Sequence, residues 1–117
     1  MNIIISIGSR QADRVLRCMQ PFVYVRGRPE RDFDTAFLYE AENAKSIIGS
    51  IRITGVFYAS PYVIWDSTRA HDCMTYSEFM TAFLPNEYMT AFFAGYTCSM
   101  EPKRCKPIPL YDFRVVK

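Results

Sequence analysis

Runs of apolar and β-branched residues predict that strands make up most of the regular structure of this chain. A continuous apolar run over residues 2–7 is typical of a buried strand, and apolar side chains recur along residues 46–58. Further strands are expected at residues 22–26, 35–39 and 88–97, with a last short one after residues 107–110.

The first helix signal lies between the first two predicted strands. Gly8 and Ser9 break the strand, and Ser9 is the expected N-cap of a helix over residues 10–18. Pro21 ends this helix because it lacks a backbone donor and restricts the residue before it. The helical spacing is carried by Ala12, Val15, Leu16 and Met19.

Two more short helices are predicted in the second half of the chain. Ser60-Pro61 starts one that continues through Trp65, because proline is favoured at the first helical position. Thr75 and Glu78 have the spacing of a capping box, in which each side chain satisfies a backbone donor near the other residue. We expect Trp65 to pack in the core.

The order of these elements favours the α+β class over a parallel βαβ fold, since strands outnumber helices and do not alternate with them. We expect a mixed or antiparallel β-barrel capped by two or three short helices. At 117 residues the chain fits a single domain, residues 1–117. Half of the residues are hydrophobic and 22% are charged, which is typical of a packed globule.

Positive charge is concentrated near the beginning of the chain, although the net charge is only +2. Residues 10–31 contain six arginines and no lysine, against two acidic residues, Asp13 and Glu30. Clustered arginines suit bidentate contacts with phosphate or carboxylate, and they equally fit a solvated surface. The sequence therefore indicates a local basic patch rather than a strongly basic protein.

Several functional classes are disfavoured. No apolar stretch is long enough to span a membrane, and the first residues lack the basic leader of a signal peptide. Four scattered cysteines indicate free thiols in a reducing cytoplasm. The glycines match no nucleotide-binding fingerprint, and His71, Cys73, Cys98 and Cys105 lack the paired spacing of a zinc site. We therefore expect neither a cofactor nor a metal.

Several short segments, taken in order, resemble the ASCH family of the PUA-like superfamily. Residues 12–16 resemble the Ala-Glu-Lys-Ile-Leu of the first family helix, and residues 44–49 resemble Val-Lys-Lys-Ile-Ile-Gly. Trp65, the Glu78-Phe79 pair and the Pro-Ile-Pro-Leu of residues 107–110 also have family counterparts. The resemblance covers nearly the whole chain and implies a PUA-like barrel.

The family's signature motif is altered in this chain. ASCH domains usually carry Gly-x-Lys-x-x-Glu-x-Arg, with threonine replacing the glutamate in some members. Here Cys18 stands for the glycine, Gln20 for the lysine and Val23 for the glutamate or threonine, while Arg26 is displaced by one residue.

Some family members resemble amidohydrolases that use a lysine, a hydroxyl group and an acid. Such chemistry requires a nucleophile, a base and an oxyanion donor within reach of each other. Asp72 lies near the position of the family's acid, but Gln20 is not a base and Val23 has no hydroxyl. The sequence therefore disfavours a retained amidohydrolase.

The resemblance instead implies a module that binds RNA or a nucleotide in a cleft between the barrel and the first helix. Arg10, Arg14, Arg26 and Arg28 are the expected phosphate contacts, and Gln20 and Tyr24 are expected to approach the base. For Tyr24, packing in the barrel core is the alternative.

Two other functions stay open. One is an amidohydrolase or ribonuclease-like enzyme with a rearranged site, which would require Asp72 and a basic residue to converge. The other is a protein-interaction or inhibitor module that has lost its ligand. The high content of aromatic residues, 15%, and the six methionines suit a surface that binds a protein partner.

Overall fold

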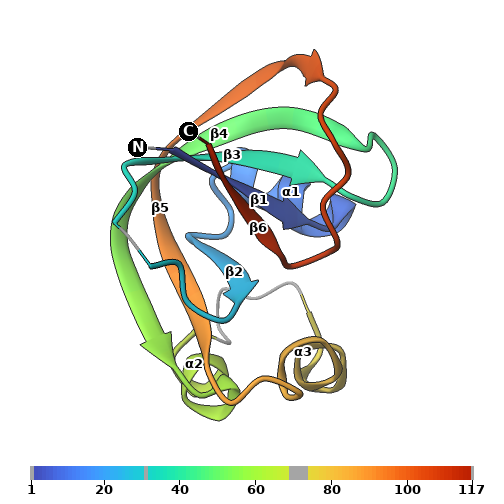
Figure 1. Ribbon diagram of the computed structural model, residues 1–117. Helices are drawn as coiled ribbons and strands as arrows, with labels where there is room; N and C mark the ends of the chain where they lie inside the picture. The colour runs from blue at the N-terminus through green and yellow to red at the C-terminus, as the bar shows by residue number, and fades with distance from the viewer. Residues whose placement is uncertain (1, 31, 69–73, 117) are drawn as a thin grey trace.

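The computed structural model describes residues 2–30, 32–68 and 74–116, and it confirms an α+β fold (Figure 1). Six strands and three helices make up the regular structure of these residues. In chain order they are β1 (Asn2–Ile7), α1 (Ser9–Leu16), β2 (Phe22–Arg26), β3 (Thr35–Glu40), β4 (Ser46–Ala59), α2 (Pro61–Thr68), α3 (Tyr76–Phe83), β5 (Met89–Lys103) and β6 (Phe113–Val116).

The six strands form one curled sheet in the order β2-β5-β4-β3-β1-β6, so the sheet is mixed as expected. β1 and β3 run parallel, and every other neighbouring pair is antiparallel. β4 and β5 are the longest strands and bend around the barrel (Figure 1). Register shifts along both strands accompany this bend, because bulges increase the local twist of a sheet.

The edge strand β2 is joined to β1, at the other side of the sheet, by Tyr111 in the segment before β6. Tyr111 donates its backbone N–H to Ser6 O at 2.9 Å, and its carbonyl accepts from the backbone N–H of Arg26 at 3.0 Å. Tyr111 has a positive φ of 68°, an uncommon conformation for a residue with a large side chain. This backbone bridge brings the two sides of the sheet together and closes one end of the barrel.

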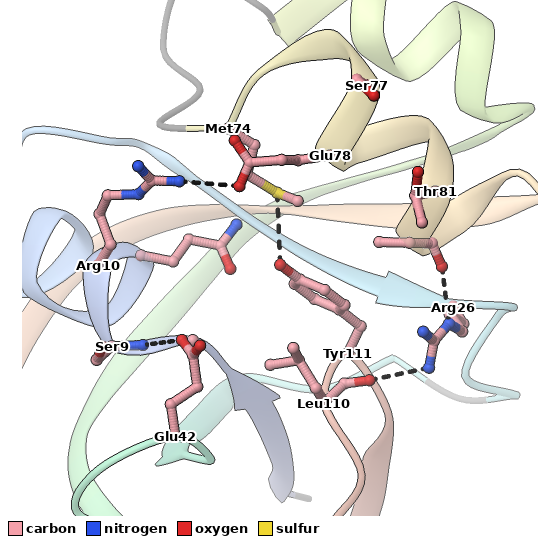
Figure 2. Close-up of a pocket in the computed structure, with 13 residues that line it drawn as sticks. Ser9, Arg10, Arg26, Glu42, Met74, Ser77, Glu78, Thr81, Leu110 and Tyr111 are labelled. Carbon is pink, nitrogen blue, oxygen red and sulfur yellow. Dashed lines mark hydrogen bonds and ion pairs between the residues drawn. The ribbon is translucent and has the colours of Figure 1, made fainter.

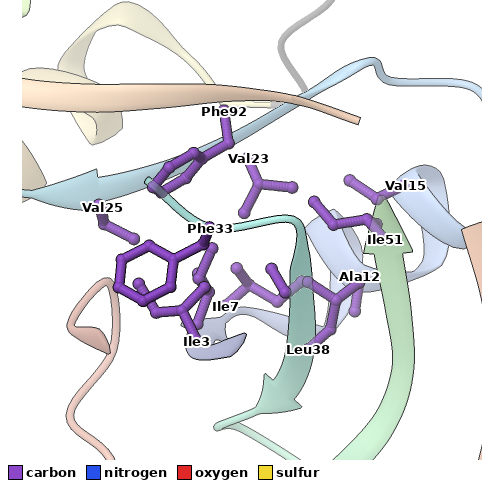
Figure 3. Close-up of a cluster of buried hydrophobic side chains, with 12 residues drawn as sticks. Ile3, Ile7, Ala12, Val15, Val23, Val25, Phe33, Leu38, Ile51 and Phe92 are labelled. Atoms are coloured by element: carbon purple, nitrogen blue, oxygen red, sulfur yellow. The ribbon is translucent and has the colours of Figure 1, made fainter. Parts of the chain in front are cut away.

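Buried side chains of the described residues form three groups, of which the smallest consists of Ile4, Tyr39, Ile47 and Ile108. The first lies inside the barrel and includes Ile3, Ile7, Val23 and Phe92 (Figure 3). The second, rich in aromatic rings, packs between the sheet and helices α2 and α3. Its buried members are Phe22, Tyr24, Ile64, Phe79, Met80, Phe83, Met89, Ala91 and Tyr111, with Trp65 partly buried against them.

The start of α1 differs from the prediction. The N-cap residue is Gly8, not Ser9, and it has no side-chain cap. The carboxylate of Glu42, from the turn after β3, instead accepts from the backbone N–H of Ser9 at 2.8 Å. A side chain at position 8 would collide with this carboxylate, so glycine lets a distant acid satisfy the helix terminus.

The other helix predictions agree better with the structure. Thr75 caps α3 and forms the predicted capping box with Glu78, with hydrogen bonds of 3.1 and 3.3 Å. Helix α1 ends at Leu16, well before Pro21, because Cys18 turns the chain with a positive φ of 58°.

Among the described residues, no helix has the length and apolar content needed to cross a membrane.

We predict that Gly49→Ala destabilises the protein by about 1–3 kcal/mol, as overpacking of a well-packed site usually does. A Cβ at this position would lie 2.6 Å from Leu16 Cδ2 and 2.8 Å from the backbone oxygen of Cys98. The β4–β5 pairing holds that oxygen in place. Urea unfolding measures the effect, and Ser99→Ala, at the paired and exposed position, is the control. An unchanged midpoint for Gly49→Ala would contradict the prediction.

Candidate functional site

A polar cleft of about 660 Å³ lies between the start of α1 and helix α3 (Figure 2). Residues from the first turn of α1 form one side, and residues from α3 form the other. Its lining consists of Gly8, Ser9, Arg10, Gln11, Arg26, Glu42, Met74, Ser77, Glu78, Thr81, Ala82, Leu110 and Tyr111. The sequence placed a cleft between the barrel and the first helix; in this cleft, α3 supplies the wall opposite α1.

The charges of this cleft are balanced within it. Arg10 pairs with Glu78 at 3.1 Å and thereby links α1 to α3 (Figure 2). Both side chains are largely exposed, so the pair contributes little to stability. With a further acid, Glu42, and a further arginine, Arg26, the lining holds two acids and two arginines. The cleft therefore suits a neutral polar group better than a strongly anionic one.

Arg26 connects three segments of the chain at the edge of this cleft. Its Nε donates to the carbonyl of Ala82 and its Nη1 to the carbonyl of Leu110, both at 2.9 Å (Figure 2). Asp112 lies 3.5 Å from the same Nη1. The guanidinium thus connects β2 to α3 and to the segment before β6. Its predicted contact with phosphate would have to use the donors that remain.

Gln11 has two unpaired polar atoms at the wall of the cleft. Its side chain is 3% exposed, and neither Nε2 nor Oε1 has a hydrogen-bond partner in the part of the chain that the structure describes. Buried polar atoms are nearly always paired, and an unpaired one costs about 1–3 kcal/mol. A ligand that pairs with this amide would remove that cost.

The residues predicted to approach a base lie elsewhere. Tyr24 is completely buried, and its hydroxyl donates to Thr68 Oγ1 at 2.8 Å within the aromatic cluster. Gln20 is 1% exposed and donates from Nε2 to Phe22 O at 2.8 Å. Neither lines the cleft. The burial of Tyr24 thus favours packing in the core over contact with a base, and Gln20 lies beneath the surface.

Two positions of the family signature, Gln20 and Val23, are buried, whereas Cys18 is exposed. Val23 packs in the barrel core, and Gln20 lies beneath the surface, so the places of the family's threonine and lysine carry no exposed reactive group. Asp72, the weak candidate for an acid, lies outside the described residues, as do His71 and Cys73. Within the described residues, no three side chains of the His, Cys, Asp and Glu types gather as a metal site requires.

Two of the four predicted phosphate contacts have no acidic partner among the residues that the structure describes. Arg14 and Arg28 form no ion pair with any described residue, whereas Arg10 and Arg26 do. Arg14 is partly buried, with an unpaired Nε, and Arg28 is exposed. The predicted basic patch is therefore divided. Arg10 and Arg26 line the cleft and form ion pairs, whereas Arg14 and Arg28 lie outside its lining and form none with any described residue.

A second cleft, of about 750 Å³, lies between the turn after β3 and the segment after β5. Lys45 and Arg104 give it positive charge. The unpaired buried polar atoms found among the described residues do not include any from this lining. Among the described residues, its lining therefore has no buried polar atom that a ligand would pair with, as Gln11 has in the first cleft.

The fold is that of a small α+β barrel protein, with a polar cleft between α1 and α3. Solved structures with this fold come from an ASCH protein of Zymomonas mobilis and two mutant forms of it. The TM-scores are 0.83 for the protein and 0.84 and 0.82 for the mutants, each at 14% sequence identity. The matches cover 99% of this chain and 87–90% of the others.

This likeness confirms the resemblance to ASCH domains at the level of the fold. At 14% identity it carries no residue roles from one protein to the other. No protein-family model matches the sequence, and no curated protein matches it.

We predict that Arg26→Lys lowers the free energy of unfolding by about 1–3 kcal/mol, because an ammonium cannot reproduce two charged hydrogen bonds made in diverging directions. Thermal unfolding tests this, with Arg17→Lys as the control at an exposed ion pair with Asp13. A variant as stable as the parent would show that Arg26 is free for a ligand.

We predict a pH effect centred on Glu78. Its pKa lies below the ordinary value, mainly because its carboxylate accepts hydrogen bonds from the backbone and hydroxyl of Thr75, with a smaller effect of Arg10. The stabilisation is therefore present above the pKa of the unfolded chain and is lost as pH falls through the lower, folded value.

Thr75→Ala should raise the pKa of Glu78, as followed by NMR titration of the carboxyl carbon, but only in part, because the backbone N–H that contributes most is kept. A return of this pKa to its ordinary value in Arg10→Ala would contradict the prediction, since it would show that the ion pair, not the capping box, dominates.

Proposed function

We propose that this protein binds RNA or a nucleotide and recognises the base in the cleft between α1 and α3. The observation that carries the proposal is the unpaired amide of Gln11 at the cleft wall. A glutamine amide offers a donor and an acceptor side by side, and the edge of a nucleobase offers the complementary pair. Such a ligand would pair with both polar atoms of the Gln11 amide.

The balance of charge supports a base rather than a phosphate in this cleft. Arg10 and Glu78 neutralise each other, and Arg26 is committed to carbonyl groups and Asp112. Ser77 and Thr81 add hydroxyl groups to the α3 side (Figure 2). Arg14 and Arg28, which have no acidic partner among the described residues, are the better candidates for phosphate contacts.

The first test is fluorescence anisotropy of a labelled eight-nucleotide RNA at 50 and 200 mM salt. We expect micromolar or tighter binding. Two phosphate contacts, at a slope of roughly 0.7 each for single strands, predict about a sevenfold loss of affinity between these salt concentrations. No binding at the lower salt concentration would refute the proposal for unmodified RNA.

The second test separates Gln11 from Gln20. We predict that Gln11→Met weakens RNA binding by about 5- to 100-fold, the range for one bidentate contact. The same change should raise the melting temperature, since it removes two buried unpaired atoms.

Gln20→Met is a matched control, because it makes the same chemical change at a buried position outside the cleft lining. If Gln20→Met and not Gln11→Met weakens binding, the base site lies where the sequence placed it and not in this cleft.

A further inference from the structure

Three exposed side chains from different parts of the chain form a stack at the ends of β2, β4 and β5. The rings of Tyr58 and Tyr88 lie 5.3 Å apart with an angle of 33° between their planes. The guanidinium carbon of Arg28 lies 4.9 Å from the centre of the Tyr58 ring. We call Arg28, Tyr58 and Tyr88 the Arg-Tyr-Tyr stack.

The turn that carries Arg28 is fixed to the sheet. Gly27 has a positive φ of 71°, and its N–H donates to the carbonyl of Tyr88 at 3.3 Å. Its own carbonyl accepts from the Thr90 hydroxyl at 2.6 Å. Both polar groups of the Gly27 backbone are thus bonded to the segment that carries Tyr88. The stack is therefore preorganised, which lowers the entropy cost of binding a ligand.

The composition of the stack sets it apart from ordinary surface residues. Tyr58 and Tyr88 are 38% and 45% exposed, so a large part of each ring meets solvent. Arg28 has no ion pair with any described residue, whereas Arg10, Arg17 and Arg26 all have one. An unpaired guanidinium on an exposed pair of rings fits a ligand that has both flat aromatic faces and negative charge.

The stack and the cleft lie on opposite faces of the sheet near the end of β2. Arg26, which lines the cleft, pairs with Met89 of the aromatic cluster, whereas Tyr58 pairs with Thr90, whose other partner is Val25 of the barrel core. Residues paired across a sheet share a face, and successive residues of a strand alternate between faces. An RNA that occupies both sites therefore has to pass around the end of the sheet.

We propose that the Arg-Tyr-Tyr stack binds a second base of a single-stranded RNA, beyond the base in the cleft. Arg28 donates to a phosphate next to this second base, and the exposed ring surface of Tyr88 stacks on the base. The ligand is then an oligonucleotide rather than a free nucleotide. This inference rests on the proposed function, since it assumes that the cleft holds a base.

The test compares an eight-nucleotide RNA with a single nucleoside monophosphate on the full chain. We expect Tyr88→Leu to weaken binding of the RNA by about 5- to 100-fold, as alanine substitution of a stacking aromatic does, and to leave the mononucleotide unaffected. Arg28→Ala should weaken RNA binding and reduce the slope of affinity against salt by about 0.7.

Matched controls use residues of the same type outside the stack. Tyr96 is 81% exposed and Arg52 is exposed, so Tyr96→Leu and Arg52→Ala should leave RNA affinity unchanged. Thermal unfolding of each variant confirms that it is folded.

The outcomes separate the two proposals. In the first case RNA binds, Gln11→Met weakens its binding, and Tyr88→Leu has no more effect than Tyr96→Leu. The stack is then overturned as a base site, and the base site in the cleft stands. If Tyr88→Leu weakens RNA binding and Gln11→Met does not, the cleft is overturned as the base site, and with it the two-base arrangement. If RNA does not bind and Tyr88→Leu abolishes self-association in sedimentation experiments, the stack is a protein interface and both proposals fail.

Discussion

The structure depends on the junction made by Arg26. Its backbone N–H joins β2 to the carbonyl of Tyr111, while its guanidinium reaches the carbonyls of Ala82 and Leu110. One residue therefore closes the sheet, attaches α3 to it and fixes one wall of the cleft. Because these bonds use main-chain acceptors, they position the segments largely irrespective of the side chains those segments carry.

Much of the fold could be predicted because local signals and tertiary packing agree. The apolar runs predicted all six strands, and Thr75 and Glu78 predicted the start of α3. The start of α1 could not be predicted in the same way. The backbone N–H of Ser9 is paired with Glu42, 33 residues further along the chain, and no local sequence pattern predicts such a partner.

The candidate site was predicted less well, for a physical reason. A motif gives the order of residues but not which side of the sheet they face, and Tyr24 and Gln20 turned out to be buried. Gln11 did leave a signal that was missed. It stands four residues before Val15, so it lies on the buried face of an amphipathic helix, where a polar side chain calls for a partner.

The pairing of β1 has a consequence for how the chain folds. One of its neighbours is β6, and Ser6 also donates to the carbonyl of Ile108, 102 positions away. During synthesis β1 emerges early and must wait for nearly the whole chain before this edge is covered. Unpaired strand edges recruit other chains, and non-local pairing is slow. Until residues 108–116 are available, this edge of β1 is therefore open to pairing with other chains or to protection by a chaperone.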